Sequence, residues 1–90
     1  MNIVWSREAI DDLARLRSYI AENDSSAAQR VAFYILHQVD AVLPDNSEFG
    51  RTGRVAGTRE LVIPKTPFIV PYRVNGQSLE ILRIYHAAQR

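Results

Sequence analysis

The sequence predicts an α+β fold in which an N-terminal strand and an antiparallel helical hairpin combine with a mostly antiparallel sheet of three or four strands. Three observations predict it. Residues 58–86 hold three runs of β-branched, aliphatic and aromatic residues separated by turn residues. Residues 6–43 carry two amphipathic helical patterns, and a short apolar run at residues 2–5 precedes them. The length predicts a single domain over residues 1–90, with both helices packed on one face of the sheet.

The first strand and the first helix follow each other closely. Residues 2–5 are apolar apart from Asn2, and we expect them to join the sheet. Ser6 suits the N-cap of a helix over residues 6–21, because its hydroxyl can accept a hydrogen bond from the first helical N–H groups. The acidic side chains of the first turns favour the positive end of the helix dipole; they are Glu8, Asp11 and Asp12. The predicted inward stripe consists of Ala9, Ile10, Leu13, Leu16 and Ile20.

A second helix is predicted after a polar break at residues 22–25. Ser26 and Gln29 have the spacing of a capping box, in which the two side chains satisfy each other's backbone N–H groups. Apolar residues then recur with a helical period as far as Leu43, and Pro44 ends the helix. The short polar connection predicts an antiparallel helical hairpin.

Residues 44–57 contain glycines and little periodicity, and they predict a loop. In the following meander, a turn centred on Asn75-Gly76 or on Gly76-Gln77 would join the last two strands. The second choice would place Arg73 opposite Glu80. Either choice gives the same two faces, and we assign the more continuous apolar one to the helices. That face holds Phe68, Val70, Tyr72, Val74, Leu79, Ile81, Arg83 and Tyr85. The other face, which includes Arg73, Ile84 and His86, is left open as a binding surface.

The net charge of +1 conceals an asymmetry between the two halves of the chain. Residues 1–48 carry four arginines against eight acidic residues, a balance of −4, whereas residues 49–90 carry six arginines and Lys65 against two glutamates, a balance of +5. Such a separation either favours an anionic partner for the basic half or reflects basic loops that fall together by chance.

Several classes of function are disfavoured by the composition. The chain has no cysteine, which excludes disulfides and a thiolate nucleophile and fits a reducing cytoplasm. We expect no signal peptide and no membrane partner, because no apolar run has the required length. There is no glycine-rich phosphate loop and no nucleophile elbow, and the two histidines form no metal motif. The sequence therefore predicts neither a small-molecule cofactor nor a metal.

The remaining candidates for chemistry are one histidine, one tyrosine and a set of arginines. His86 ends the last strand and could act as a general acid or base, or be structural. Tyr85 could stack on a nucleic-acid base. Six arginines could read phosphates or could be ordinary solvated side chains. They are Arg51, Arg54, Arg59, Arg73, Arg83 and Arg90.

The whole pattern resembles the RelE/ParE superfamily, the toxins of bacterial type II toxin–antitoxin systems. The segments that carry the resemblance are residues 6–13, 55–61, 72–74 and 80–86, and the likeness spans nearly the whole chain. It implies a small cytoplasmic growth inhibitor that is neutralised by a cognate antitoxin. RelE-like members cleave messenger RNA on the ribosome, whereas ParE-like members poison DNA gyrase.

The resemblance also implies site residues for RNA cleavage, and the matching positions are Arg59, Arg83, Tyr85 and His86. The other arginines of the basic half are our candidates for target binding: Arg51, Arg54, Arg73 and Arg90. Many RNA-cleaving relatives carry an arginine where this chain has Phe68, which favours the gyrase inhibitor over the ribonuclease. A small non-enzymatic binding module of the same shape is the third hypothesis, because a fold does not fix a function.

Overall fold

The computed structural model describes residues 1–89, and it has the predicted order of one strand, two helices and a run of strands. The helices are α1 (Arg7–Ala21) and α2 (Ser25–Val42). The strands are β1 (Asn2–Trp5), β2 (Arg51–Thr52), β3 (Arg59–Val62), β4 (Phe68–Asn75), β5 (Ser78–Ile81) and β6 (Tyr85–His86). A 3-10 turn, Ala87–Gln89, follows β6. Arg90 lies outside the described residues.

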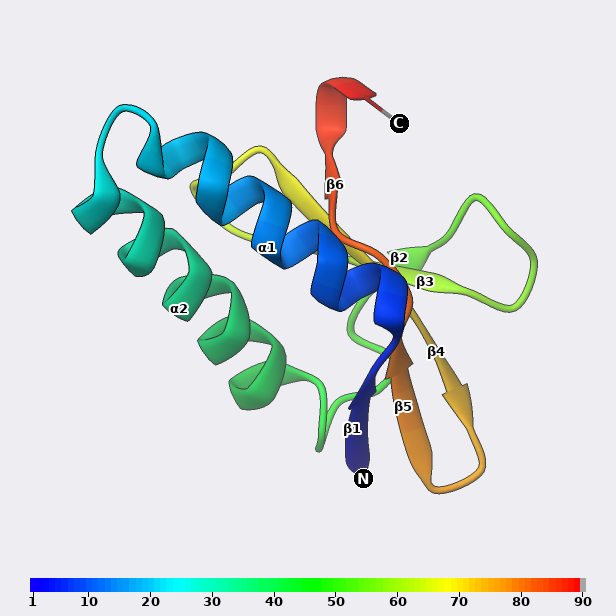
Figure 1. Ribbon diagram of the computed structural model, residues 1–90. Coiled ribbons are helices and arrows are strands. Elements are labelled where there is room, and N and C mark those ends of the chain that lie inside the picture. The colour runs from blue at the N-terminus through cyan, green and yellow to red at the C-terminus, as the bar shows by residue number, and fades with distance from the viewer. Residues whose placement is uncertain (90) are drawn as a thin grey trace.

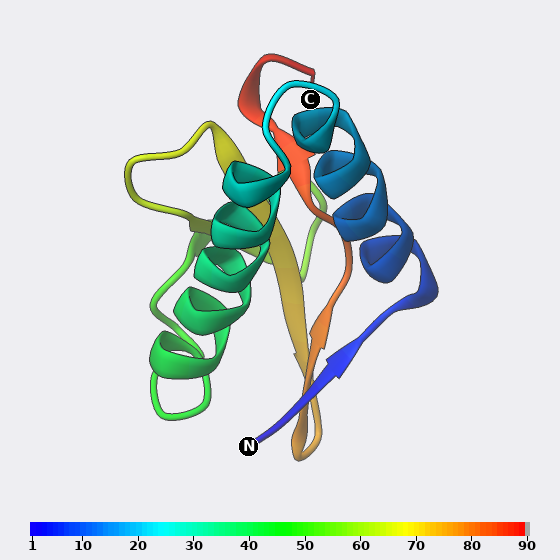
Figure 2. The ribbon, with the colours of Figure 1, turned by 60° about the vertical axis from the view of Figure 1, so that its left-hand side comes forward.

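The sheet is mixed but mostly antiparallel, as the sequence predicts. Its strands lie in the order β1-β5-β4-β3-β2, and β6 pairs with β4 beyond the end of β5. β1 runs parallel to β5, so the first strand of the chain lies beside one of the last. Figures 1 and 2 show the two helices side by side, both on the same face of this sheet. The α+β fold class and the helical hairpin are therefore confirmed.

Helix α1 begins where the sequence predicts. Ser6 is its N-cap, with extended backbone angles, and its Oγ accepts a hydrogen bond of 3.0 Å from the N–H of Ala9. Ala9 is fully buried, and Leu13 and Leu16 pack against the core beside it. The assignment of Ile10 to the inward stripe is wrong: 52% of Ile10 is exposed, because it follows the buried Ala9 directly and so faces about 100° away from it.

Helix α2 begins earlier than the sequence predicts. Asp24 is the N-cap and accepts a hydrogen bond of 3.0 Å from the N–H of Ala27. Ser26 is already helical, and its Oγ accepts a hydrogen bond from Arg30 instead of capping a backbone N–H. The predicted capping box is therefore wrong, because an aspartate two residues earlier satisfies the same need. The helix ends at Val42, immediately before the capping Leu43 and Pro44.

This difference in capping predicts unequal effects of two neighbouring substitutions. Asp24→Ala removes the acceptor for the first turn and is expected to lower the free energy of unfolding by about 1 kcal/mol. Ser26→Ala is expected to change it by less than about 0.5 kcal/mol, because that side chain is exposed and caps nothing. Urea titrations of the two variants measure both values, and a larger effect for Ser26→Ala would restore the predicted capping box.

The core lies between the helices and the sheet face predicted to meet them. Ile35 and Val39 of α2 are fully buried, and so is Leu43, the C-cap of this helix. Facing them are the buried side chains of three strands and their extensions: Leu61, Ile63, Val70, Tyr72, Leu79 and Ile81. Val74 is on the predicted face but is 45% exposed, because it lies at the hairpin end of β4 beyond the cover of the helices.

The β4–β5 hairpin has the second of the two predicted registers. Asn75 pairs with Ser78, so the turn consists of Gly76-Gln77, and Arg73 stands opposite Glu80, as this one of the two alternatives requires. Gly76 has a φ of +63°, a conformation that glycine adopts without steric cost. Arg73 and Glu80 form an ion pair across the two strands.

One element of the sheet lies inside the predicted loop. β2 pairs with β3, and it is held there by Tyr72, whose side chain is completely buried. The phenol oxygen of Tyr72 donates to the carbonyl of Ser47 and accepts from the N–H of Gly50, both at 2.8 Å. A Cβ on Gly50 would lie 2.6 Å from that oxygen, so only glycine fits this approach. The sequence shows no periodicity here because a distant tyrosine fixes the segment.

A β-bulge displaces the last residues of the chain. Leu82 donates to the carbonyl of Pro71, which continues the β4–β5 register, yet Tyr85 stands opposite Ile69. Two residues, Arg83 and Ile84, therefore oppose one residue of β4, which defines a bulge. The change reverses the faces beyond it.

The bulge overturns part of the predicted face assignment. Ile84, expected on the open face, is only 6% exposed and belongs to the core. His86, also expected on the open face, pairs with Phe68, and their rings make an edge-to-face contact with centroids 5.9 Å apart. Tyr85 correspondingly shares the register position of Ile69, not of Phe68. A one-residue insertion cannot be read from a run of alternating residues, because the run itself remains regular.

Candidate functional site

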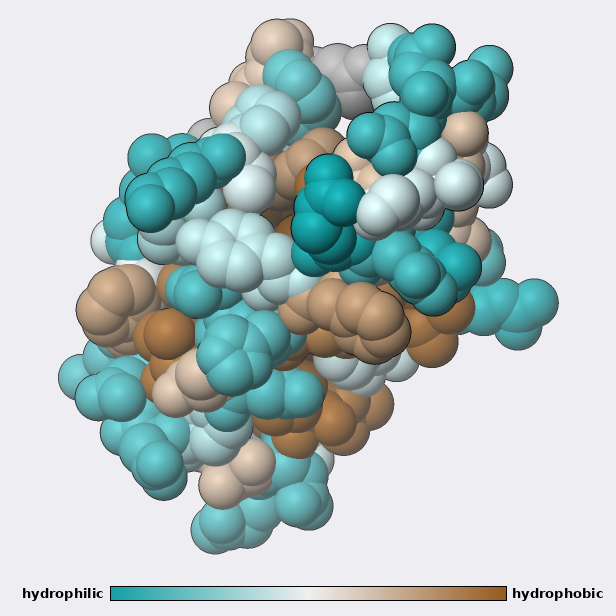
Figure 3. Space-filling view, turned by 90° about the vertical axis from the view of Figure 1, so that its left-hand side faces the viewer, coloured by the Kyte–Doolittle hydropathy of each residue, from teal (hydrophilic) through white to brown (hydrophobic). Residues whose placement is uncertain are grey.

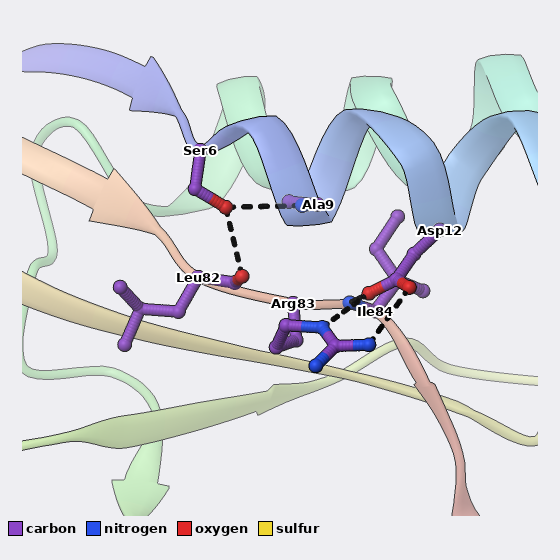
Figure 4. Close-up of polar contacts among 6 residues, drawn as sticks. All are labelled: Ser6, Ala9, Asp12, Leu82, Arg83 and Ile84. Carbon is purple, nitrogen blue, oxygen red and sulfur yellow. Dashed lines mark hydrogen bonds and ion pairs between the residues drawn. The ribbon is translucent and has the colours of Figure 1, made fainter.

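The most elaborate set of polar contacts joins α1 to the bulge (Figure 4). Asp12 accepts three hydrogen bonds there. Arg83 donates from Nε to Oδ2 at 2.8 Å and from Nη2 to Oδ1 at 3.0 Å, and the backbone N–H of Ile84 donates to Oδ2 at 2.9 Å. The carboxylate thus occupies both nitrogens on one edge of the guanidinium and also satisfies a backbone donor that the bulge removes from the sheet.

Ser6 strengthens the same connection nearly two turns earlier. Its hydroxyl donates to the carbonyl of Leu82 at 2.8 Å while accepting from Ala9, so the N-cap of α1 is tied to the residue that precedes the bulge (Figure 4). The N-cap Ser6 and Asp12 of α1 therefore hold residues 82–84 in place.

The environment of Asp12 changes its acidity. Burial alone would raise the pKa of the carboxyl, but the hydrogen bonds from Arg83 and Ile84 and the charges of Arg83 and Arg15 outweigh it. The net result is a pKa below the ordinary value of 3.8. The same contact raises the pKa of Arg83. At neutral pH both groups are charged, and the acidic and basic halves of the chain neutralise each other at this point.

A groove lies beside this connection, between the helices and the C-terminal strand. Its volume is about 820 Å³. Residues of α1, α2, β4, the bulge and β6 line it, together with Pro67 just before β4. They are Asp12, Arg15, Leu16, Tyr19, Ile20, Val31, Pro67, Phe68, Arg83, Ile84, Tyr85 and His86. Figure 3, which views the helical side of the molecule, shows hydrophobic side chains exposed between hydrophilic ones.

Three of the four predicted catalytic residues line this groove. Arg83 is 41% exposed as a side chain and stacks over the ring of Tyr85, with its Cζ 5.2 Å from the ring centroid. His86 is partly exposed, and its Nδ1 accepts a hydrogen bond from the N–H of Ala88. Nδ1 of His86 is therefore occupied as an acceptor, and only Nε2 is left for proton transfer.

Arg59, the fourth predicted catalytic residue, lies elsewhere. It lies on β3, opposite Tyr72 of β4. His86 lies on β6, opposite Phe68 and on the other side of β4. Four residues along a strand and two strand spacings across correspond to roughly 16 Å between their Cα atoms. The Nη1 of Arg59 donates to the carbonyls of Gly50 and Glu48, so this side chain holds the segment before β2.

The predicted target-binding arginines are spread over the sheet and its loop. Arg51 pairs with Glu60, and Arg73 pairs with Glu80; both arginine side chains are 53% exposed. Arg54 is exposed in the β2–β3 connection, and Arg90 lies outside the described residues. Because two of these cations have carboxylate partners on the sheet, the open face carries less positive charge than the sequence suggests.

Sequence reasoning missed the role of Asp12, although a signal was present. We assigned it to the helix dipole, yet it lies three residues after Ala9 and four before Leu16, on the apolar stripe of α1. A carboxylate on an inward stripe requires a partner in the core, and this reasoning would have pointed to a buried or half-buried cation.

Solved structures with the same architecture define the class of protein first. The chain resembles the chromosomal ParDE toxin–antitoxin system from P. aeruginosa with a TM-score of 0.86 and 32% identity, covering 96% of this chain and 95% of that one. YafQ from E. coli shares the fold alone, with a TM-score of 0.57 and 14% identity over 98% of this chain and 94% of that one. The class is that of the RelE/ParE superfamily toxins.

The sequence comparisons then give the family. The model of the ParE toxin of the type II toxin–antitoxin system parDE matches residues 3–90. The chain is 41% identical to Y4kP of Sinorhizobium fredii, covering 98% of this chain and 90% of that protein. It is 35% identical to the toxin RelE2 of Caulobacter vibrioides, covering 97% and 96%. The chain belongs to the ParE toxin family of type II toxin–antitoxin systems, which confirms the predicted superfamily and toxin role.

Membership in this family settles two broader questions. The protein is a toxin whose partner class is an antitoxin, and the hypothesis of an unrelated binding module is wrong. No helix within residues 1–89 is both long and apolar enough to span a membrane.

Proposed function

We propose that this toxin arrests growth in the cytoplasm by binding DNA gyrase and that it does not cleave RNA. One observation carries the proposal: the residues that would form a ribonuclease site are not assembled as one. Phosphodiester cleavage needs an acid or base and unengaged cations around a single phosphate. The four candidates here are divided between two places and are largely engaged by other groups.

The separation between Arg59 and His86 supports this proposal. At roughly 16 Å between Cα atoms, both side chains reach one phosphate only if they extend fully toward each other. Arg59 instead donates to two backbone carbonyls before β2. Releasing it would leave those acceptors without their partner.

The ion pair of Arg83 is a second argument against cleavage. Nε and one N–H of Nη2 are bonded to Asp12, so the edge that suits a bidentate phosphate contact is already filled by a carboxylate. Phe68, at the position where many RNA-cleaving relatives carry an arginine, adds an apolar ring beside His86.

The alternative is a ribosome-dependent ribonuclease, and one observation favours it. Arg83, Tyr85 and His86 line the same groove, where a base would stack on the ring of Tyr85 in the place that Arg83 now takes. In that case Arg83 would have to exchange Asp12 for a phosphate when RNA binds.

For the gyrase contact, we propose the exposed rim of the sheet face that the helices leave uncovered, because the centre of that face, with Ile69 and Glu60, is itself buried. Arg51 and Arg73 are half-exposed on this face, and Arg54 is exposed in the adjacent loop. Arg90 is the fourth predicted contact. Since Arg51 and Arg73 are each paired with a glutamate, they would contribute orientation and partner choice more than net attraction.

Purified toxin tests the target directly. We expect it to inhibit DNA supercoiling by gyrase and to accumulate gyrase–DNA cleavage complexes, with no cuts in messenger RNA during translation in a reconstituted ribosome system. Cuts within codons, together with unaffected gyrase, would overturn the proposal in favour of the ribonuclease.

The His86→Ala variant separates the same two mechanisms in cells. Since a gyrase inhibitor needs no proton transfer from His86, we expect the variant to keep its growth arrest, measured as viable counts after induction. The melting temperature of the variant serves as the control for folding. Loss of arrest in a folded His86→Ala variant would count against gyrase and for cleavage.

A further inference from the structure

Strand β1 forms one margin of the sheet, with β5 on one side of it and, among residues 1–89, no strand on the other (Figure 1). The N–H groups of Asn2 and Ser6 donate toward β5, over 3.1 Å and 2.9 Å. Backbone groups alternate in direction along a strand, so the N–H and C=O groups of Ile3 and Trp5 point away from β5. These groups are therefore left for water or for another strand.

This edge lacks the features that usually prevent strands from pairing. β1 carries no charged residue and no proline, whereas β2, at the opposite margin of the sheet, begins with the half-exposed Arg51. Apolar side chains lie on both faces of β1. Val4 is 46% exposed on the face away from the helices, and Ile3 and Trp5 are only partly buried on the other. An uncharged, apolar edge of this kind favours the addition of a further strand.

We propose that the free edge of β1 pairs antiparallel with the β1 of a second copy of this chain, so that two sheets join into one. An identical strand fits this edge, because two copies of a charged strand would repel each other, whereas β1 has no charge that would repel its own copy or attract a charged partner. The inference concerns the toxin by itself and does not depend on gyrase as the target.

One register satisfies every free backbone group of the two strands. With a twofold axis through Val4, Ile3 of one copy stands opposite Trp5 of the other, and each such pair exchanges both of its hydrogen bonds. Val4 then faces its own counterpart in a non-hydrogen-bonded pair, where side chains approach each other most closely. On the helix side, each Ile3 lies beside a Trp5, an aliphatic–aromatic pair of the kind that stabilises antiparallel strands. The same pairing thus covers apolar surface on both faces.

The proposed contact is small. One strand of four residues from each copy buries less than the roughly 1,200 Å² at which stable interfaces begin. We therefore expect a weak, reversible dimer whose fraction rises with protein concentration. Sedimentation velocity of the full-length toxin over a range of concentrations measures this fraction.

Two valines provide a matched pair of variants. Val4 and Val62 are 46% and 45% exposed, and both face away from the helices, but Val62 is on β3, at the other side of the sheet. Val4→Lys would set two ammonium groups against each other across the twofold axis, and we expect it to weaken the dimer at least roughly tenfold. Val62→Lys should change it less than about twofold, because its side chain lies away from the contact. Melting temperatures check that both variants are folded.

The Val4→Cys variant tests the register itself. The chain has no cysteine of its own, so a disulfide between two copies must use the introduced thiol. Facing residues of a non-hydrogen-bonded pair have Cα atoms about 4.5 Å apart, a separation that a disulfide spans. In the presence of oxidised glutathione, we expect Val4→Cys to form a covalent dimer, seen by non-reducing electrophoresis, and Val62→Cys to form little.

Amide hydrogen exchange gives a readout that needs no substitution. The N–H groups of Ile3 and Trp5 should exchange more slowly as the toxin concentration rises, because the dimer makes them hydrogen-bonded. Three outcomes would overturn the inference: a monomer at every concentration, equal effects of Val4→Lys and Val62→Lys, or equal cross-linking of Val4→Cys and Val62→Cys. Slow exchange at Ile3 and Trp5 that appears only after antitoxin is added would also overturn it, because the edge would then belong to the antitoxin.

Discussion

The Asp12→Ala variant is expected to lose roughly 2–3 kcal/mol of unfolding free energy, mainly because the substitution removes the acceptor of three hydrogen bonds at once. The N–H of Ile84 would be left without a partner next to a buried side chain, and this makes the largest contribution. The ion pair itself contributes less, because Arg83 is 41% exposed and water screens it. Urea denaturation followed by circular dichroism measures the loss.

Asp11→Ala is the matched control for this prediction. Asp11 is exposed on the same turn of α1, and its replacement should change stability by less than about 0.5 kcal/mol. Equal losses for the two variants would mean that the Asp12 contact with the bulge does not stabilise the fold.

The stabilisation by Asp12 also depends on pH in a defined direction. Since its pKa is lower in the folded protein than the ordinary 3.8, its contribution is fully present well above pH 3.8 and is lost as the pH falls below that value. The stability difference between wild type and Asp12→Ala should therefore be constant between pH 5 and 7 and shrink below about pH 4. A difference that grows on acidification would show that the folded-state pKa is raised instead.

The Tyr72→Phe variant is expected to lose about 2 kcal/mol, because the buried phenol oxygen bonds the carbonyl of Ser47 and the N–H of Gly50. Without it, both backbone groups lose a partner, and the segment that carries β2 should open more often. We expect faster amide hydrogen exchange at Gly50 and at residues 51–52, measured by mass spectrometry or NMR.

Tyr34→Phe is the matched control for Tyr72→Phe. Tyr34 also donates its hydroxyl to a backbone carbonyl, that of Pro64, but this contact is exposed to water. Its removal should change stability by less than about 1 kcal/mol, because water replaces the lost partner. Comparable losses in the two variants would contradict the assigned importance of the buried site.

The sequence predictions were accurate for features that nearby residues determine, and they failed for most features that depend on residues far away in the sequence. Ser6 as an N-cap and the end of α2 before Pro44 were predicted correctly, because each depends on nearby residues. The β4–β5 hairpin was also predicted, but the sequence left two registers open, and the structure has the one that pairs Arg73 with Glu80. The capping box at Ser26 was wrong for a local reason, since Asp24 offers an equivalent acceptor earlier. Ile10 was misplaced because its neighbour Ala9 occupies the inward position.

Features that depend on distant contacts could not be predicted. β2 forms in a stretch without periodicity because Tyr72, more than twenty residues later, bonds to Gly50. The bulge moves Ile84 into the core and changes the faces of Tyr85 and His86. The prediction of which residues of the last strand face the helices was therefore wrong beyond Leu82. The four candidate catalytic residues share one stretch of sequence, but the pairing of strands separates Arg59 from His86.

The sequence by itself determined the first strand, both helices and the strands of the meander, their order, and the helix-covered face as far as the bulge, and its overall pattern also pointed to the toxin class. These features depend on hydrophobic periodicity, caps and turns, which are local properties of the chain. Only the tertiary structure decided that Asp12 accepts hydrogen bonds from Arg83 and from the N–H of Ile84 in the bulge. The same contacts decide which guanidinium groups remain available to partners. The two residues are 71 positions apart, and only the packing of α1 against the C-terminal strand brings their opposite charges within hydrogen-bonding distance.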